Sequence, residues 1–336
     1  MTTRRSAIKL TGAALISGAA FALEGCDQNT SYIQTWEGEA LGAPASIKIV
    51  RVNSKKGKPY GLFVSDARVK TILQDARDEI ARLEKMFSLY DPSSDISRLN
   101  RDGGLDNAPQ EFIDILQSAR TVSEYTHGAF DITVQSLWKT AEFLTRAKLT
   151  KEGVEQAWAE AYARVDYQFV LVKNRRVEFS KLGVAITLNG IAQGFITEAV
   201  VTVLRKNGVN SALVNIGEYS GFGSRAWDIG VQDPNNMMDM VEIVKLQNAS
   251  LATSSAKGGY LGEHLSHIFS PRTGHKKPQF ISASVVHERA AIADALATAY
   301  TLMDEDGIGK NWRDTGAKYI LLVRENGDII RIGQPS

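Results

Sequence analysis

Six short apolar runs with the alternation of β-strands fill the last third of the chain, and they constrain the fold more than any other feature. They cover residues 211–216, 226–231, 240–247, 281–287, 317–323 and 328–332. Upstream, residues 46–50 alternate in the same way, residues 169–179 have the pattern of a β-hairpin, and residues 184–188 predict a further strand. Because strands outnumber helices, the sequence predicts an α+β fold with largely antiparallel sheets and packed helices.

Three earlier segments predict helices. Apolar residues recur at helical spacing over 66–87, and a second stripe over 109–127 ends at a glycine. A third helix is expected over 191–206, directly after a turn that contains Gly190. Unpaired N–H groups at such a helix start can bind an anion. The spacing of Gly190 and Gly194 is, however, more typical of close helix packing.

The helix-like run 293–299 carries the most suggestive pair of side chains. On a helix, Asp294 and Thr298 are four residues apart and share one face. A carboxylate and a hydroxyl so placed suit Mg²⁺, which prefers oxygen ligands and leaves positions for water and phosphate. Two structural alternatives stay open, because Asp can favour a first-turn dipole and a mid-helix Thr can bond back to a carbonyl.

Four colinear blocks resemble the motifs of the FAD:protein FMN transferases, the ApbE-like flavin transferase family. They are Phe87-Ser88-Leu89-Tyr90 with residues 94–100; residues 128–134; residues 213–217 with 227–234; and Ser266-His267-Ile268-Phe269-Ser270-Pro271-Arg272-Thr273-Gly274 followed by residues 293–299. The resemblance covers nearly all of the chain after its leader, and blocks in a shared order are more specific than any single motif.

This resemblance implies FAD and Mg²⁺ as ligands and assigns residues to them. Catalysis would rest on His267, as general base or phosphate orienter, together with Asp294 and Thr298; the last two and the Gly190 carbonyl would bind the metal. The implied cofactor contacts are Tyr90, Ala129, Phe130, Asp131, Thr187, Gln193, Ile268 and Arg272. Without the family match, Asp131 would be read as a turn residue, His267 as a core histidine and Arg272 as a surface ion pair.

The chain departs from the family pattern at several of these positions. Thr187 and Gln193 stand where the family commonly has an acid and a lysine, which bears on FAD binding. The family's Gly-Gly-Asp corresponds here to Gly217-Glu218-Tyr219, and its Asp-Pro-Arg to residues 270–272. The metal pair and the histidine are retained.

The first residues resemble a leader. Paired arginines, Arg4 and Arg5, precede a short apolar stretch that is too weak for a good membrane span, so residues 1–25 predict a twin-arginine export signal. Cys26 follows in a lipoprotein-like context and would then carry a lipid anchor to the inner membrane. Residues 26–45 are expected to be a linker leading into the first strand, and residues 46–336 the catalytic domain.

Composition adds two exclusions. The chain of 336 residues has 43% hydrophobic and 23% charged residues, as globular proteins do, and a net charge of +1 that gives no reason to expect a nucleic-acid partner. A single cysteine excludes an intramolecular disulfide.

The resemblance therefore implies an exported, periplasmic enzyme that moves FMN from FAD onto a threonine hydroxyl of a target redox protein and releases AMP. Two alternatives remain on sequence alone. Water in place of threonine would give an FAD pyrophosphatase that yields FMN and AMP. The changes at Thr187 and Gln193 would also fit a flavin carrier without catalysis.

Overall fold

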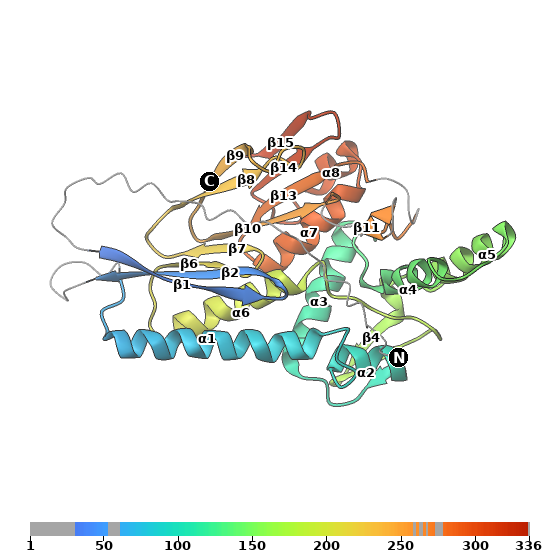
Figure 1. The fold of residues 1–336 in the computed structure, drawn as a ribbon, viewed down its shortest axis with the longest axis horizontal. Helices are drawn as coiled ribbons and strands as arrows, with labels where there is room; N and C mark the ends of the chain where they lie inside the picture. The colour runs from blue at the N-terminus through green and yellow to red at the C-terminus, as the bar shows by residue number, and fades with distance from the viewer. Residues whose placement is uncertain are drawn as a thin grey trace, which may run out of the picture.

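An antiparallel sheet of eight strands forms the centre of the molecule in the computed structural model (Figure 1). The structure describes residues 31–52, 61–257, 260–261, 265–266, 268–272 and 278–334. In spatial order the strands are β1 (Ser31–Ala40), β2 (Ala43–Val52), β6 (Ala212–Asn215), β7 (Tyr219–Phe222), β10 (Ala249–Ser255), β13 (Ser282–His287), β14 (Tyr319–Val323) and β15 (Ile329–Gly333). Every neighbouring pair is antiparallel.

Helices cover one face of this sheet. The long helix α1 (Asp66–Phe87) runs beneath the strands, with α6 (Ala192–Lys206) between them and α3 (Gln110–Tyr125) and α7 (Ala290–Leu302) alongside (Figure 1). Their apolar stripes share the main core with the strands. Since α6 contacts α1 and α7, and α7 contacts α6, β10 and β13, these two helices lie at the heart of the layer.

A β-hairpin covers the other face. It consists of β8 (Trp227–Gln232) and β9 (Met240–Leu246), whose buried residues form a second core with the sheet. Side chains alternate between the cores along β14: Ile320 and Leu322 face the helices, whereas Tyr319 and Leu321 face the hairpin. This period of two is what an all-apolar strand buried on both faces requires.

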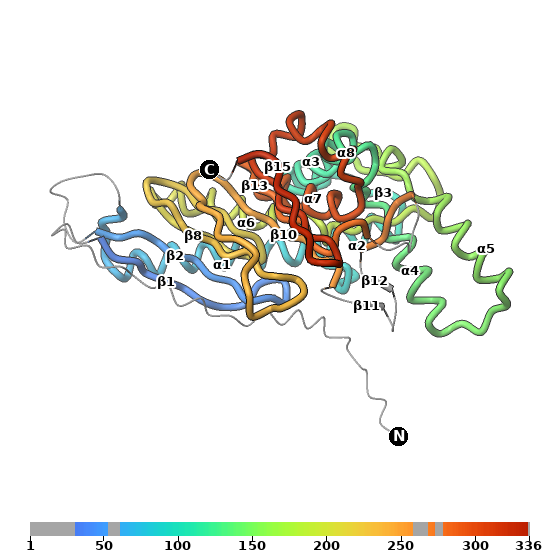
Figure 2. The backbone as a smooth tube through the Cα atoms, turned by 90° about the horizontal axis from the view of Figure 1, so that it is seen from above, coloured from blue at the N-terminus to red at the C-terminus, as the bar shows by residue number. Residues whose placement is uncertain are grey.

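Smaller elements extend the molecule at one end, where α5 projects outward in both views (Figures 1 and 2). A three-stranded sheet has the order β3 (Gly104–Leu105), β5 (Arg176–Phe179), β4 (Val170–Lys173). The remaining elements are α2 (Asp95–Asp102), the 3₁₀ turns η1 (Ile132–Val134) and η2 (Tyr167–Phe169), α4 (Gln135–Leu144), α5 (Lys151–Tyr162), α8 (Glu305–Asn311), and the short β11 (Tyr260–Leu261) and β12 (Leu265–Ser266). Phe269 packs between Trp138 and Trp158 and joins the loop after β12 to α4 and α5.

Most predicted elements are confirmed, including all six late strands, the hairpin and the helices α1, α3, α6 and α7. Two predictions need correction. Residues 31–40 form the strand β1, fully paired with β2, where the sequence suggested a linker. Residues 184–188 form no ladder with the described strands, although they read as a strand. The strands β7 and β10 were missed, because glycine, serine and threonine weaken their apolar pattern.

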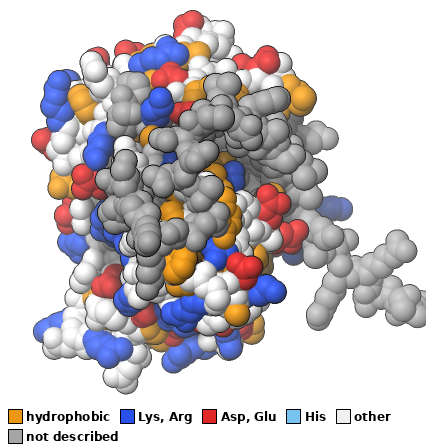
Figure 3. Space-filling model, turned by 90° about the vertical axis from the view of Figure 1, so that its left-hand side faces the viewer, with side chains coloured by type: hydrophobic (Ala, Val, Ile, Leu, Met, Phe, Trp, Pro, Cys, Tyr) orange, Lys and Arg blue, Asp and Glu red, His pale blue; other side chains and the backbone are white. Residues whose placement is uncertain are grey.

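The surface is of mixed charge. Figure 3 shows basic and acidic side chains interspersed over one face, which agrees with the small net charge of +1. Across the described residues, no helix has the combination of length and apolar character that crossing a membrane needs.

Candidate functional site

Asp294 and Thr298 project from the second and third turns of α7 toward its neighbours in the core. The Oγ1 atom of Thr298 lies 3.0 Å from Oγ of Ser254 on β10. Oδ2 of Asp294 accepts the backbone N–H of Gly194 at 3.0 Å. Asp294 thereby caps α6, whose own N-cap residue, Ile191, provides no side-chain hydrogen bond. Both side chains therefore form their hydrogen bonds with other elements and not within their own helix.

Gly190 meets this pair from the turn that precedes α6. A Cβ atom at Gly190 would lie 3.0 Å from Oγ1 of Thr298 and 3.3 Å from Cε2 of Phe130, so position 190 contacts both predicted site residues. Gly194 has a different role. Its Cβ would lie only 2.3 Å from the carbonyl oxygen of Ala290, which confirms close packing of α6 on α7 as the reason for this glycine.

The segment 184–188 is held by a side chain in place of a strand partner. Asn100 donates from Nδ2 to the carbonyl of Ile186 at 2.8 Å and accepts the N–H of Ile186 on Oδ1 at 2.7 Å. The N–H of Thr187 donates to the carbonyl of Ile132 at 2.8 Å. These bonds satisfy the extended backbone without a ladder, and they bring Thr187 beside the 128–134 block. The Thr187 hydroxyl accepts the N–H of Asn189, so this side chain stabilises the turn toward Gly190.

Asp131 organises the loop that follows α3. Its Oδ1 atom accepts the N–H of Thr133 at 2.8 Å and the hydroxyl of Thr133 at 2.6 Å, while Oδ2 accepts the N–H of Tyr167 at 2.8 Å. Burial raises the pKa of Asp131 to about 6, although all three hydrogen bonds favour its ionised form. The turn and cap role considered from the sequence is therefore present. A role in cofactor binding remains a prediction.

Gln193 and the loop before β7 lie against each other. A Cβ atom at Gly217, whose φ is +88°, would fall 2.3 Å from Nε2 of Gln193, so only glycine permits this approach. The next residue, Glu218, is buried and accepts the N–H of Thr253 on Oε2 at 3.0 Å. Burial and, secondarily, the charge of Asp294 raise the pKa of Glu218 well above its ordinary range. Burial likewise raises the pKa of Asp294.

The other predicted cofactor contacts differ in how exposed their side chains are. The Tyr90 side chain is 85% exposed, Ala129 is half-buried and Ile268 is buried. The guanidinium of Arg272 donates to the carbonyl of His127, which joins the 268–272 loop to the residues preceding Ala129. His267 lies outside the described residues, so its role stays a prediction.

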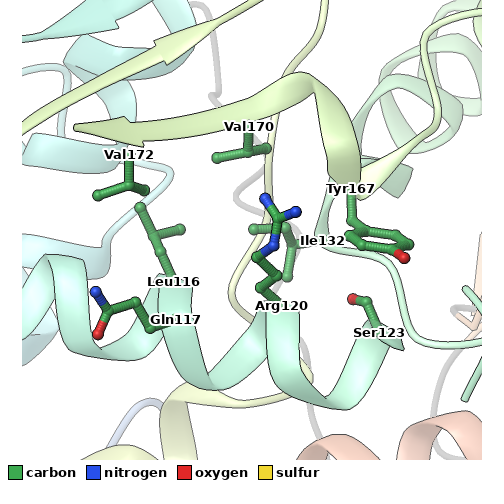
Figure 4. A pocket seen from close by; sticks show the side chains of 8 residues that line it. All are labelled: Leu116, Gln117, Arg120, Ser123, Ile132, Tyr167, Val170 and Val172. Atoms are coloured by element: carbon green, nitrogen blue, oxygen red, sulfur yellow. The ribbon is translucent and has the colours of Figure 1, made fainter. Parts of the chain in front are cut away.

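Two cavities adjoin the motif blocks. One of about 340 Å³ is lined by Leu89, Ser97, Asn100, Arg101, Gln135 and Lys139, which come from the first block and from α4 directly after the second. Five of its six lining residues are polar or charged, two of these are basic, and burial lowers the pKa of Lys139. Another, of about 260 Å³, lies between α3 and β4, where Arg120 and Tyr167 point into the space (Figure 4). None of the predicted site residues lines either cavity.

The donor set around Asp294 fits a hard cation. Only the Gly194 N–H donates to Asp294 among the described residues, which leaves Oδ1 available, and the Thr298 and Ser254 hydroxyls face each other beside it. No group of three or more His, Cys, Asp or Glu side chains in the described chain could hold a metal. Mg²⁺ does not require one, because it is commonly held by one or two carboxylates and completes its shell with water and phosphate.

Comparison with known proteins decides the family. The sequence model of the ApbE family matches residues 41–321, which include every residue of this centre. The chain belongs to the ApbE family. Its resemblance to the family, read from four motif blocks, is thereby confirmed.

ApbE relatives match along most of their length. The FAD:protein FMN transferase of Klebsiella pneumoniae is 23% identical over 93% of this chain and 92% of its own, and that of Treponema pallidum is 26% identical over 69% and 71%. The ApbE protein of Thermotoga maritima has a TM-score of 0.71 at 28% identity, covering 89% of this chain and 97% of that structure. The apo Pseudomonas stutzeri flavinyl transferase ApbE has a TM-score of 0.72 at 22% identity, covering 91% and 97%. These structures confirm the α+β fold.

Three residues around the ApbE site have a structural role that the sequence did not predict. Asn100 ends the first block, and its two hydrogen bonds to the backbone of Ile186 were not predicted. Ser254 lies on a strand that the apolar pattern did not reveal. Glu218 was noted only as a departure from Gly-Gly-Asp. That departure was the available signal, since the resemblance implies a glycine at this position and a carboxylate there must be accommodated.

Proposed function

We propose that this chain is an FAD:protein FMN transferase that uses Mg²⁺ to move FMN from FAD to a threonine hydroxyl of a target protein, with release of AMP. One observation carries the proposal: Asp294 and Thr298 lie on one face of α7, against Gly190 and Ser254, with one carboxylate oxygen of Asp294 accepting no hydrogen bond from the described residues. The names of the curated relatives support the flavin-transfer activity.

In the proposed reaction, the threonine oxygen forms a bond to the FMN phosphorus as the bond between that phosphorus and the AMP oxygen breaks. The hydroxyl proton passes to His267, and AMP leaves with the electron pair of the broken bond. When bound, Mg²⁺ would offset the negative charge of the diphosphate. Asp294, Thr298 and the Gly190 carbonyl would hold it, and Arg272 would add positive charge near the phosphates.

Phe130 and Gly190 would form the wall of the FAD site next to the metal. Because Phe130 is buried and contacts position 190, it holds the 128–134 loop against the turn before α6. Thr187 and Gln193 would contribute neutral hydrogen-bonding groups where related sequences have charged ones. Tyr90, which is largely exposed, is free to stack on a flavin or adenine ring.

The test is an intact-mass measurement. The purified chain, FAD and MgCl₂ are incubated with a redox domain that carries an acceptor threonine. An FMN adduct on the domain, together with AMP, supports the transferase. AMP without an adduct would establish the pyrophosphatase instead, and unchanged FAD bound to the chain would establish the carrier.

Two variants link this activity to the metal residues. Asp294→Ala should abolish adduct formation, and Thr298→Val should reduce it strongly because the hydroxyl is replaced at nearly constant volume. Thr202→Val is the matched control, since the Thr202 hydroxyl bonds to the Glu198 carbonyl on an exposed part of α6. Normal turnover of Asp294→Ala with Mg²⁺ would contradict the assignment.

The place of action is also a proposal. We propose that residues 1–25 direct export by the twin-arginine route and that Cys26 anchors the periplasmic enzyme to the inner membrane. Fractionation of cells and intact-mass analysis of the membrane form test this. A full-length, cytoplasmic product would contradict export, and an unmodified Cys26 in the exported product would contradict the anchor.

A further inference from the structure

Glu218 occupies a position where the sheet loses a strand partner. The pairing of β10 with β7 aligns Leu251 with Tyr219, so the N–H of Thr253 would next pair with residue 217. The chain instead turns away at Gly217 in the left-handed region. The Glu218 carboxylate supplies the missing acceptor to Thr253 at 3.0 Å. This bond directs the side chain inward, and only 6% of the residue is exposed.

Two sets of hydrogen bonds place Glu218 near Asp294. On one side, the Glu218 carbonyl accepts the hydroxyl of Thr197, which is on α6 one turn beyond Gly194, the residue that binds Asp294. On the other side, Thr253 precedes Ser254, whose hydroxyl meets Thr298. The two contacts place Glu218 between the start of α6 and the Asp294–Thr298 face of α7.

Two buried acids therefore lie in the same part of the core, and no described Lys, Arg or His pairs with either of them. Asp294 is 5% exposed, and each carboxylate accepts a single hydrogen bond from the described residues, on one oxygen only. Neither forms an ion pair with a described Lys, Arg or His. Buried carboxylates are costly unless they are paired or coordinate a metal. The hydroxyls of Thr298 and Ser254 add two further oxygens, the ligand type that suits Mg²⁺ or Mn²⁺.

We propose that Glu218 is a second carboxylate ligand of the divalent cation. The inference rests on the proposed metal site at Asp294 and Thr298. With two carboxylates, the protein itself balances the charge of the cation, so the metal binds before and without the nucleotide. A site with one carboxylate would depend on the diphosphate for much of its affinity.

The experiment measures Mn²⁺ and Mg²⁺ binding to the purified chain without FAD, by titration calorimetry and, for Mn²⁺, by the loss of free-ion electron paramagnetic resonance signal. Glu218→Gln keeps an oxygen for the Thr253 N–H and removes only the charge, so it should fold and should bind Mn²⁺ at least about tenfold more weakly. Asp294→Asn should weaken binding further. Asp228→Asn, on the exposed face of β8, is the control for overall charge and should bind as wild type.

A second readout separates a structural role from a metal ligand. Without metal, Glu218→Gln should melt at the wild-type temperature or above it, because one buried charge is gone; added Mg²⁺ should raise its melting temperature less than that of wild type. Wild-type affinity in Glu218→Gln, combined with loss of binding in Asp294→Asn, would overturn the role of Glu218 and leave the metal site intact. Wild-type affinity in Asp294→Asn would overturn the proposed metal site itself.

Discussion

The contact between α6 and α7 at Gly194 allows a sharp test, because Gly194→Ala brings a methyl group onto backbone atoms. The new Cβ would lie 2.3 Å from the Ala290 carbonyl oxygen and 2.8 Å from Cα of Ala291. Backbone cannot rotate away as a side chain can, so α6 must shift from α7. The same shift lengthens the hydrogen bond from the Gly194 N–H to Asp294, which is 3.0 Å now.

Three contributions set the magnitude. Overpacking in a filled core costs about 1–3 kcal/mol, and weakening a buried hydrogen bond to a charged group costs about 1.5–3 kcal/mol. Alanine offsets about 1 kcal/mol through its better helix propensity. The net loss of stability is about 1.5–5 kcal/mol, which for a chain of this length corresponds to a fall in melting temperature of roughly 2–7 °C.

Thermal unfolding followed by circular dichroism measures the effect, with Gly309→Ala as the matched control. Gly309 also lies in a helix, α8, but its Cβ would meet no atom within 4 Å. Gly309→Ala should therefore melt at the wild-type temperature or slightly above it. If Gly194→Ala behaves like this control, the close approach of α6 and α7 is wrong, and so is the cap that Asp294 provides.

Three further predictions follow from neighbouring contacts. Asn100→Ala leaves the N–H and carbonyl of Ile186 without their partners, so unfolding in urea should show a loss of about 1–3 kcal/mol, with weaker FAD binding by fluorescence titration. Asp131 has a folded pKa of about 6, above its unfolded value near 3.8, so its contribution favours folding at low pH and is lost as the pH rises from about 4 to 6. The stability of wild type relative to Asp131→Asn should fall across that window, and a constant difference would contradict the raised pKa. Gly190→Ala crowds the Thr298 hydroxyl, which can still rotate away. We therefore expect a clear loss of Mn²⁺ affinity in the titration and only a small change in melting temperature. A large fall in melting temperature with unchanged Mn²⁺ affinity would contradict this expectation.

Local patterns in the sequence were sufficient for most elements of the fold. The helix period over 66–87 and the alternation of the late strands depend on residues a few positions apart, and both predictions are confirmed. The strand predicted at 184–188 was wrong, because an extended apolar run says nothing about its partner. Here that partner is the side chain of Asn100, 86 positions away from Ile186.

The candidate site was likewise predicted in part from local patterns. The helical period alone places Asp294 and Thr298 on one face of α7, and the motif blocks point to residues that the structure brings together, among them Gly190 and Phe130. The roles of Asp131 and Gln193 in binding a cofactor stay predictions, as does that of His267.

Sequence by itself determined which short segments become helices and strands, and it marked one helix face as chemically unusual, because both depend on spacing along the chain. Only the tertiary structure decided that Asp294 caps a helix 100 positions away and that Glu218 lies beside it. Such contacts arise where packed helices and a departing strand leave backbone groups unpaired, and no local pattern encodes which distant side chain will satisfy them.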